Sequence, residues 1–154
     1  MNSPLLPKWL TYLFFIPALL GFADASYLAA EHYLGRVPPC GIVSGCETVT
    51  LSKYSVIAGI PVALLGAIFY LTVLVLLVAY FDSKKEFYVK IAAYAAIPSF
   101  LGTLWFLFAQ FFLLHAVCIY CLGSAFTDTL IFTAAIIFFV RARKINSLAQ
   151  NDSR

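Results

Sequence analysis

Four long apolar runs, separated by short polar stretches, dominate the sequence. They cover residues 9–30, 56–81, 88–114 and 116–140. A helix needs about 20 mostly apolar residues to cross the hydrocarbon core of a bilayer, and each run is long enough. The pattern therefore predicts an all-α membrane protein in which four transmembrane helices form one bundle.

The polar connections indicate how these helices are arranged. The third and fourth runs are separated only by a tight turn near His115, so they are expected to be antiparallel neighbours. Residues 35–55 form the one sizeable loop, and loops of this length are usually functional or disordered. We therefore expect a single domain over residues 1–154, with the loop 35–55 as its candidate catalytic segment.

Composition and charge exclude several classes of protein. Hydrophobic residues make up 63% of the chain and charged residues 11%, whereas soluble domains carry about 25% charged residues. The polar surface is too small for a water-soluble body, so lipid is the expected surrounding. The net charge is only +3, and the basic residues lie at segment ends rather than along a stripe, so no nucleic-acid partner is expected.

The basic residues also predict the orientation of the helices. Arg36 and Lys53 belong to the long loop. The other eight fall on the opposite side of the expected membrane: Lys8, Lys84, Lys85, Lys90, Arg141, Arg143, Lys144 and Arg154. Cytoplasmic segments carry the excess of lysine and arginine. Both termini are therefore expected in the cytoplasm, in a multi-pass cell (inner or plasma) membrane, with the long loop on the outer or periplasmic side.

A cleaved signal peptide is an alternative interpretation of the N-terminus. Lys8, the apolar run after it and the segment Ala23-Asp24-Ala25 loosely resemble one. The apolar run continues to Ala30, however, and an acid in the middle of a cleavage site is unusual. A retained first helix is therefore the preferred interpretation, and the outside placement of the loops holds either way.

Four cysteines lie on the expected outer side, where disulfides persist. Cys40 and Cys46 are in the long loop, and Cys118 and Cys121 form a Cys-x-x-Cys motif at the start of the fourth run. Four cysteines allow three pairings, of which the local one, 40–46 with 118–121, is the obvious resting state. Such small closed loops gain little unfolded-state entropy, which argues against a purely structural role.

The position of the Cys-x-x-Cys motif predicts reactivity. At a helix N-terminus, the helix dipole and the free backbone amides favour the thiolate and lower the pKa of a cysteine. Two pairs that face each other can then pass electrons by thiol–disulfide exchange. We therefore predict that the four cysteines are catalytic, and that they form a relay between an outer protein thiol and a redox carrier in the bilayer.

Two other interpretations of the cysteines are weaker. Four cysteines could bind zinc, but the spacing of the first pair is wide for a zinc knuckle and the second pair enters a membrane helix, so no metal is predicted. The pairs could also be disulfide staples in a non-catalytic membrane scaffold. The Cys-x-x-Cys spacing at the start of a helix favours reactivity over that role.

The motifs occur in a specific order: Cys40 with Cys46, then Ser52, then Cys118-Ile-Tyr-Cys121. This ordered set resembles the vitamin K epoxide reductase (VKOR) family, over about residues 10–140. Several further segments are typical of its bacterial members: Ala25-Ser26-Tyr27-Leu28, Glu31-His32, Gly59-Ile60-Pro61, Leu65-Gly66 and Phe69-Tyr70. In the DsbB proteins, which are functional analogues, the Cys-x-x-Cys pair comes first, so the order here favours the VKOR family.

The resemblance implies a four-helix bundle with its catalytic loop outside. Bacterial members oxidise a thioredoxin-fold partner and pass two electrons to a quinone. The implied partner is an exported thioredoxin-fold (DsbA-like) protein, and the implied cofactor is a membrane quinone such as ubiquinone or menaquinone. By resemblance and position, Cys40 faces the partner and Cys46 attacks Cys118. Cys121 faces the quinone, and Ser52 matches a family residue near the quinone, where its hydroxyl could hold a carbonyl oxygen.

Two departures from the family pattern refine this expectation. The chain stops at Arg154, so the thioredoxin-like domain fused to some bacterial members is expected to be absent and the partner separate. The animal enzymes carry an asparagine near the start of helix two and a tyrosine just after the Cys-x-x-Cys motif, where this sequence has Val62 and Ala125. Those polar groups contribute to epoxide chemistry. We therefore expect plain quinone reduction, with a vitamin K (epoxide) reductase as the alternative.

Asp24 and Asp128 are acids inside the expected spans. Acids there are costly and are functional candidates, although hydrogen bonds between helices are their commoner role. Asp128 follows Cys121 by seven residues and so lies on the same helix face.

His32 and His115 lie at the outer rim, where His115 could tune the pKa of Cys118. These four roles are left open by the sequence, as are the direction of electron flow and the identity of the quinone.

Overall fold

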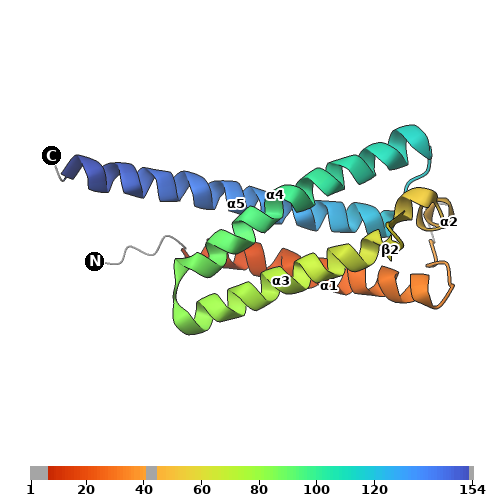
Figure 1. Cartoon of the computed structure of the whole chain (residues 1–154), viewed down its shortest axis with the longest axis horizontal. Coiled ribbons are helices and arrows are strands. Elements are labelled where there is room, and N and C mark those ends of the chain that lie inside the picture. The colour runs from red at the N-terminus through yellow and green to blue at the C-terminus, as the bar shows by residue number, and fades with distance from the viewer. Residues whose placement is uncertain (1–6, 41–44, 153–154) are drawn as a thin grey trace.

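A computed structural model describes residues 7–40 and 45–152 of the chain. Its four long helices are α1 (Lys8–Tyr33), α3 (Val62–Ser83), α4 (Glu86–Phe108) and α5 (Ile119–Asp152), shown in Figure 1. α4 continues into a π-helical turn, η2 (Ala109–Leu113). All four segments are long and apolar enough to cross a membrane. The prediction of an all-α membrane protein with four spanning helices is confirmed.

The segment between α1 and α3 contains small elements that the sequence pattern did not indicate. These are α2 (Cys46–Thr50), η1 (Lys53–Ser55) and the two-residue strands β1 (Val56–Ile57) and β2 (Ile60–Pro61). The strands pair antiparallel, with Val56 opposite Pro61 and Ile57 opposite Ile60.

The expected second span, 56–81, therefore begins too early, because α3 starts at Val62. Ala58 and Gly59 both have positive φ angles, 50° and 83°, which a tight hairpin turn requires and a helix forbids. Pro61 then precedes the first helical residue, a position where its missing N–H costs nothing. The other expected ends also shift, since α5 begins at Ile119 rather than 116 and continues to Asp152 rather than 140.

The helices form a ring in which α1 and α4 each pack against both α3 and α5. In lipid, helices associate through close van der Waals packing, which small residues at the contacts allow. Ala18, Ala93 and Ala134 are fully buried in the main core. A Cβ atom on Gly21 of α1 would overlap the ring of Tyr70 of α3, so that contact depends on the glycine.

The tightly packed core lies toward one end of the bundle. It combines residues of all four long helices, most of them from the first half of α1, the first half of α4 and the middle of α5, with Phe14, Leu77, Val89 and Ile131 fully buried. The start of α1, the end of α5 and the turn between α3 and α4 lie at this end (Figure 1). Toward the other end, where the long loop lies, α3 and α4 diverge (Figure 1). That end holds the candidate site.

Candidate functional site

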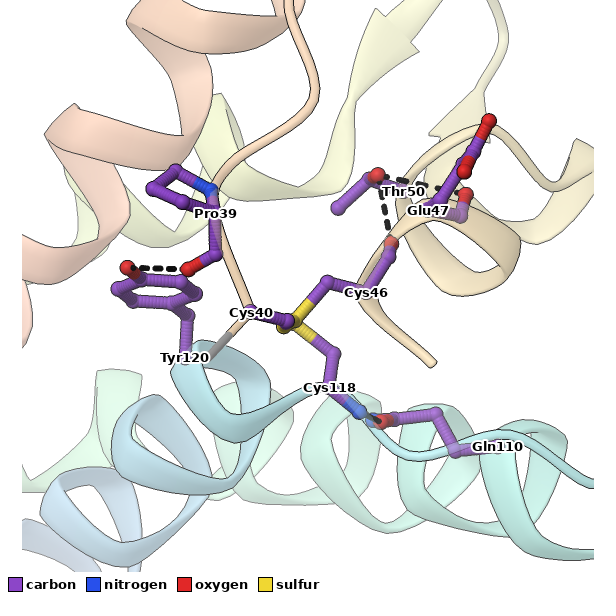
Figure 2. The surroundings of a disulfide bond; sticks show 8 residues. All are labelled: Pro39, Cys40, Cys46, Glu47, Thr50, Gln110, Cys118 and Tyr120. Carbon is purple, nitrogen blue, oxygen red and sulfur yellow. Dashed lines mark hydrogen bonds between the residues drawn. A yellow bond between two sulfur atoms is a disulfide. The ribbon is translucent and has the colours of Figure 1, made fainter. Parts of the chain in front are cut away.

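All four cysteines lie together at the loop end of the bundle. Cys40 and Cys46 form a disulfide with their Cα atoms 6.0 Å apart. Cys118 is 0% exposed and packs in one cluster with Cys46 and Val49, while Cys40 and Cys121 pack against that cluster. Figure 2 shows the Cys118 side chain pointing at the disulfide. The structure therefore brings the two predicted pairs into contact, as a relay requires.

The redox states of the two pairs differ. The local disulfide expected for the loop is present, whereas Cys118 and Cys121 are thiols. The resting disulfide expected between the helix pair is thus absent from this form, in which the loop is oxidised and the helix pair reduced. Within residues 7–40 and 45–152, no group of three histidine, cysteine or acidic side chains is placed to hold a metal ion.

Cys118 occupies the N-cap of α5. Its carbonyl accepts the first helical hydrogen bond, from Leu122 N–H at 3.0 Å. Its sulfur accepts hydrogen bonds from the Cys121 thiol and from the backbone amides of Cys121 and Tyr120, the positions that an N-cap side chain normally satisfies. The hydrogen bond from the Cys121 thiol is the largest cause that lowers the pKa of Cys118, to about 7, against the opposing effects of burial and of Asp24. The pKa of Cys118 thus changes in the expected direction, but the thiol of Cys121 contributes more than the backbone amides at the helix start.

This pKa predicts a specific pH dependence. In a variant with Cys40→Ser and Cys46→Ser, thiolate absorbance at 240 nm should titrate first near pH 7, and reactivity toward a small alkylating reagent should fall about tenfold per pH unit below that midpoint. Adding Cys121→Ala removes the main hydrogen-bond donor to the thiolate. The midpoint should then rise by about 1–2 pH units, which is the equivalent of the about 1.5–3 kcal/mol that a hydrogen bond to a charged group contributes. A first midpoint at the ordinary thiol value of about 8.5 would contradict this arrangement.

Gln110, a fully buried residue of η2, fixes the position of Cys118. Its Oε1 accepts the Cys118 N–H at 3.0 Å, and its backbone carbonyl accepts the N–H of Ala116 at 3.1 Å. The intervening His115 has φ 48°, so the chain reverses within a very tight turn. Single π-helical turns occur often at functional sites. Sequence reasoning missed Gln110, although an uncharged amide in an apolar span is a signal of the same kind as the acids.

The loop cysteines are also held against α5. The Tyr120 hydroxyl donates to the carbonyl of Pro39, next to Cys40, at 3.2 Å (Figure 2). On the other side, Gly45 lies directly against the backbone of Val117, where a Cβ atom would be 2.6 Å from the Val117 nitrogen. Together these contacts place the disulfide over the N-terminus of α5.

A cavity of about 460 Å³ lies next to the cysteine cluster. Residues of α1, α3, α4 and α5 line it, together with residues of the long loop, and most of the lining is apolar. Cofactor pockets have this size and character. Of the four cysteines, Cys121 lines the cavity, so the reduced pair touches the disulfide at one side and the cavity at the other.

Comparison with protein families shows to which family the chain belongs. The profile of the vitamin K epoxide reductase family matches residues 12–136, which is most of the chain. The chain belongs to the vitamin K epoxide reductase family. A comparison with curated proteins gave no match. Family membership, with four apolar helices, makes the chain a multi-pass membrane redox enzyme, and this VKOR family is linked to quinone and vitamin K chemistry.

The residues present fit a quinone in this VKOR-family cavity. A flat apolar ring suits apolar walls, and polar side chains at two ends of the cavity could meet its carbonyl oxygens. Those near the loop are Thr50, Tyr54 and Ser55, and those deeper in the bundle are Ser99, Thr103 and Asp128. Val62 and Ala125, which are both apolar, also line the cavity.

Ser52 lies beside this cavity and is not among the residues that line it. Its hydroxyl donates to the Val49 carbonyl at 2.8 Å, and its own carbonyl accepts a hydrogen bond from the Ser55 hydroxyl at 2.7 Å. In this form Ser52 therefore stabilises the turn that carries Ser55, and a direct contact with quinone stays a prediction.

Proposed function

We propose that this VKOR-family protein is a quinone-dependent thiol–disulfide oxidoreductase. It forms disulfides in an exported thioredoxin-fold (DsbA-like) partner and passes the two electrons through Cys40 and Cys46, then Cys118 and Cys121, to a membrane quinone. One observation carries the proposal: Cys121 belongs both to the cluster of four cysteines and to the wall of the apolar cavity. Electrons that arrive at the loop disulfide thus have a continuous sulfur path to that cavity.

The exposure of the cysteines supports an order of exchange. Cys40 is partly exposed, whereas Cys46 is 1% exposed. A partner thiolate attacks Cys40 and releases Cys46, and the second partner thiol then breaks the mixed disulfide, leaving the partner oxidised and the loop reduced. Cys46 next attacks Cys118 in the Cys118–Cys121 disulfide and releases Cys121 as the thiolate.

The second half of the cycle returns the loop to its oxidised form. Cys40 attacks Cys46 in the bridge to Cys118, which restores the Cys40–Cys46 disulfide and leaves Cys118 and Cys121 reduced, the form described above. A quinone held in the cavity would accept two electrons and two protons. Formation of the Cys118–Cys121 disulfide supplies the electrons, and the two thiols release the matching number of protons.

The cavity supports plain quinone reduction over epoxide chemistry. Val62 and Ala125 are apolar and offer no hydrogen bond at the two places where the animal enzymes have polar groups. We also propose that the loop end of the bundle is outside and that both termini are cytoplasmic. The start of α1, the α3–α4 turn and the last part of α5 carry most of the basic residues, and disulfides persist outside the cytoplasm.

The proposal is tested by two electron donors and one variant. Purified protein with a reduced exported thioredoxin-fold protein should consume decylubiquinone or menadione. Cys40→Ser should lower this rate at least about 100-fold, because the partner loses the sulfur it attacks. With dithiothreitol, which feeds the Cys118–Cys121 pair directly, the same variant should keep a rate within about threefold of the unmutated protein. Folded protein that transfers electrons from neither donor would instead be a disulfide-stapled scaffold.

A further inference from the structure

Asp128 forms a buried polar site at the deep end of the cavity. Its side chain is 2% exposed and lines the cavity. Ser99 Oγ donates to its Oδ1 at 2.9 Å, and Thr103 Oγ1 donates to its Oδ2 at 2.6 Å. Ser99 and Thr103 are one helical turn apart on α4 and also line the cavity. Two hydroxyl groups of one helix therefore aim a carboxyl group of another.

The hydrogen bonds of Asp128 join α4 to α5, and they also leave its carboxyl group in the wall of the cavity. An acid within a membrane helix is costly, so it is a candidate for function even where it also forms hydrogen bonds to a neighbouring helix. In the part of the chain that the structure describes, the hydrogen-bond partners of Asp128 are these two hydroxyls, and neither is basic. The uncharged acid is the cheaper form in such surroundings. A carboxyl group has about four acceptor sites and, when protonated, one donor, so capacity remains for a ligand in the cavity.

The position of Asp128 relative to Cys121 matches a quinone ring. Both residues line the cavity from α5. Seven residues separate them, which puts them on nearly the same helix face and about 10 Å apart along the axis. The two carbonyl groups of a quinone lie at opposite ends of the ring. A quinone whose ring reached Cys121 with one edge would therefore extend its opposite oxygen toward Asp128.

We propose that Asp128, aimed by Ser99 and Thr103, is a catalytic acid that hydrogen-bonds the quinone oxygen remote from Cys121 and gives it a proton. The inference rests on the proposed function. Cys118 and Cys121 lose two electrons and two protons as their disulfide forms, and the quinone gains two of each. The Asp128 O–H bond breaks as the quinol O–H bond forms. Asp128 then takes a proton from water, which balances one of the two released by the thiols, and the other thiol proton goes to the quinone oxygen near Cys121.

Two variants separate proton donation from packing. Asp128→Asn keeps a hydrogen-bond donor but has no acidic proton, so kcat for dithiothreitol-driven decylubiquinone reduction should fall about 100-fold, within the usual contribution of a general acid. Asp128→Leu loses the hydrogen bond as well. In a Trp9→Phe background, quenching of Trp105, which lines the cavity, reports decylubiquinone binding. Affinity should stay within about threefold for Asp128→Asn and fall about tenfold for Asp128→Leu.

Controls keep the test specific to this carboxyl group. Thr129→Val removes the neighbouring hydroxyl of α5, which bonds only to the Ala125 carbonyl among the described contacts and does not line the cavity, and it should change neither readout. Asp128→Glu should recover at least about tenfold of the lost kcat, since it restores the acid. Should Asp128→Asn fail to accumulate, Ser99→Ala with Thr103→Val should lower kcat about tenfold without affecting exchange between the cysteine pairs.

The measurements distinguish failure of the Asp128 role from failure of quinone reduction itself. A kcat for Asp128→Asn within threefold of the unmutated protein, or equal losses of affinity for the Asn and Leu variants, would overturn the role of Asp128 while leaving quinone reduction in place. An unchanged kcat in the Ser99 and Thr103 double variant would do the same. Absence of thiol-driven quinone reduction in the unmutated protein would overturn the proposed function, and the acid role with it.

Discussion

Replacing Cys121 by serine should stop quinone reduction and trap a disulfide between Cys46 and Cys118. Cys121 is the sulfur that lines the cavity, so its loss should lower the rate at least about 1,000-fold, as removal of a directly reacting group does. Cys118 keeps the N-cap position, and its thiol stays buried against Cys46. With no Cys121, the bridge from Cys118 to the loop has no competing disulfide on α5, and Cys40 is the thiol left to reopen it. The bridge should therefore accumulate beside the Cys40–Cys46 disulfide under oxidising conditions.

Mass mapping of the disulfides in Cys121→Ser decides the order of the relay. Cys118→Ser is the matched control, because it changes the other half of the motif and should leave Cys121 without a bridge to the loop. A dominant Cys40–Cys118 bridge would mean that the two loop cysteines have exchanged roles. No bridge between loop and helix would mean that the two pairs act separately.

The sequence predicted the helices well because their signal is local. Each span is a continuous apolar run. In lipid, a helix is the structure in which a single segment satisfies all of its own backbone hydrogen bonds. The short elements of the loop have no such signal. Val49, for example, is fully buried against Cys46 and Cys118, so the five-residue helix α2 depends on a contact with residues about 70 positions away in the chain.

The start of α3 could have been placed more closely from the sequence. Val56 and Ile57 are apolar and extend the second run, which hides the boundary. Gly59 and Pro61, however, are turn signals in the sequence. In the structure, Gly59 has a positive φ angle in the hairpin turn, and Pro61 is the N-cap of α3. Hydrophobicity alone therefore overestimates a span when a short apolar hairpin precedes it.

The same distinction applies to the site. The direction of the pKa change at Cys118 was predictable from a cysteine at the start of a helix, but its largest cause, the hydrogen bond from the Cys121 thiol, was not part of that prediction. The group of Ser99, Thr103 and Asp128 was not predictable, because it joins residues 25 and 29 positions apart through the packing of α4 on α5. Gln110 likewise acquires its role only through a π-helical turn that the apolar pattern does not reveal.

Gly45→Ala should uncouple the two cysteine pairs without damaging either one. Gly45 precedes Cys46 at the start of α2 and has ordinary negative φ, so backbone strain is not the issue. A Cβ atom there would be 2.6 Å from the Val117 nitrogen, and the obstacle is backbone, which cannot rotate away. The loop must therefore retreat from α5. Displacements of about 1 Å can cost about 100-fold in rate, and we expect that loss for exchange between Cys46 and Cys118.

The measurement compares the two electron donors. Quinone reduction driven by a reduced thioredoxin-fold protein should fall about 100-fold in Gly45→Ala, whereas the rate with dithiothreitol should stay within about threefold, because the helix pair and the cavity are untouched. Gly123→Ala is the matched control, since Gly123 lies on α5 with open space around its Cα. Combining Gly45→Ala with Cys121→Ser should also lower the yield of the Cys46–Cys118 bridge. An undiminished yield would show that Cys46 reaches Cys118 by a movement of the loop that does not need Gly45 to lie on Val117.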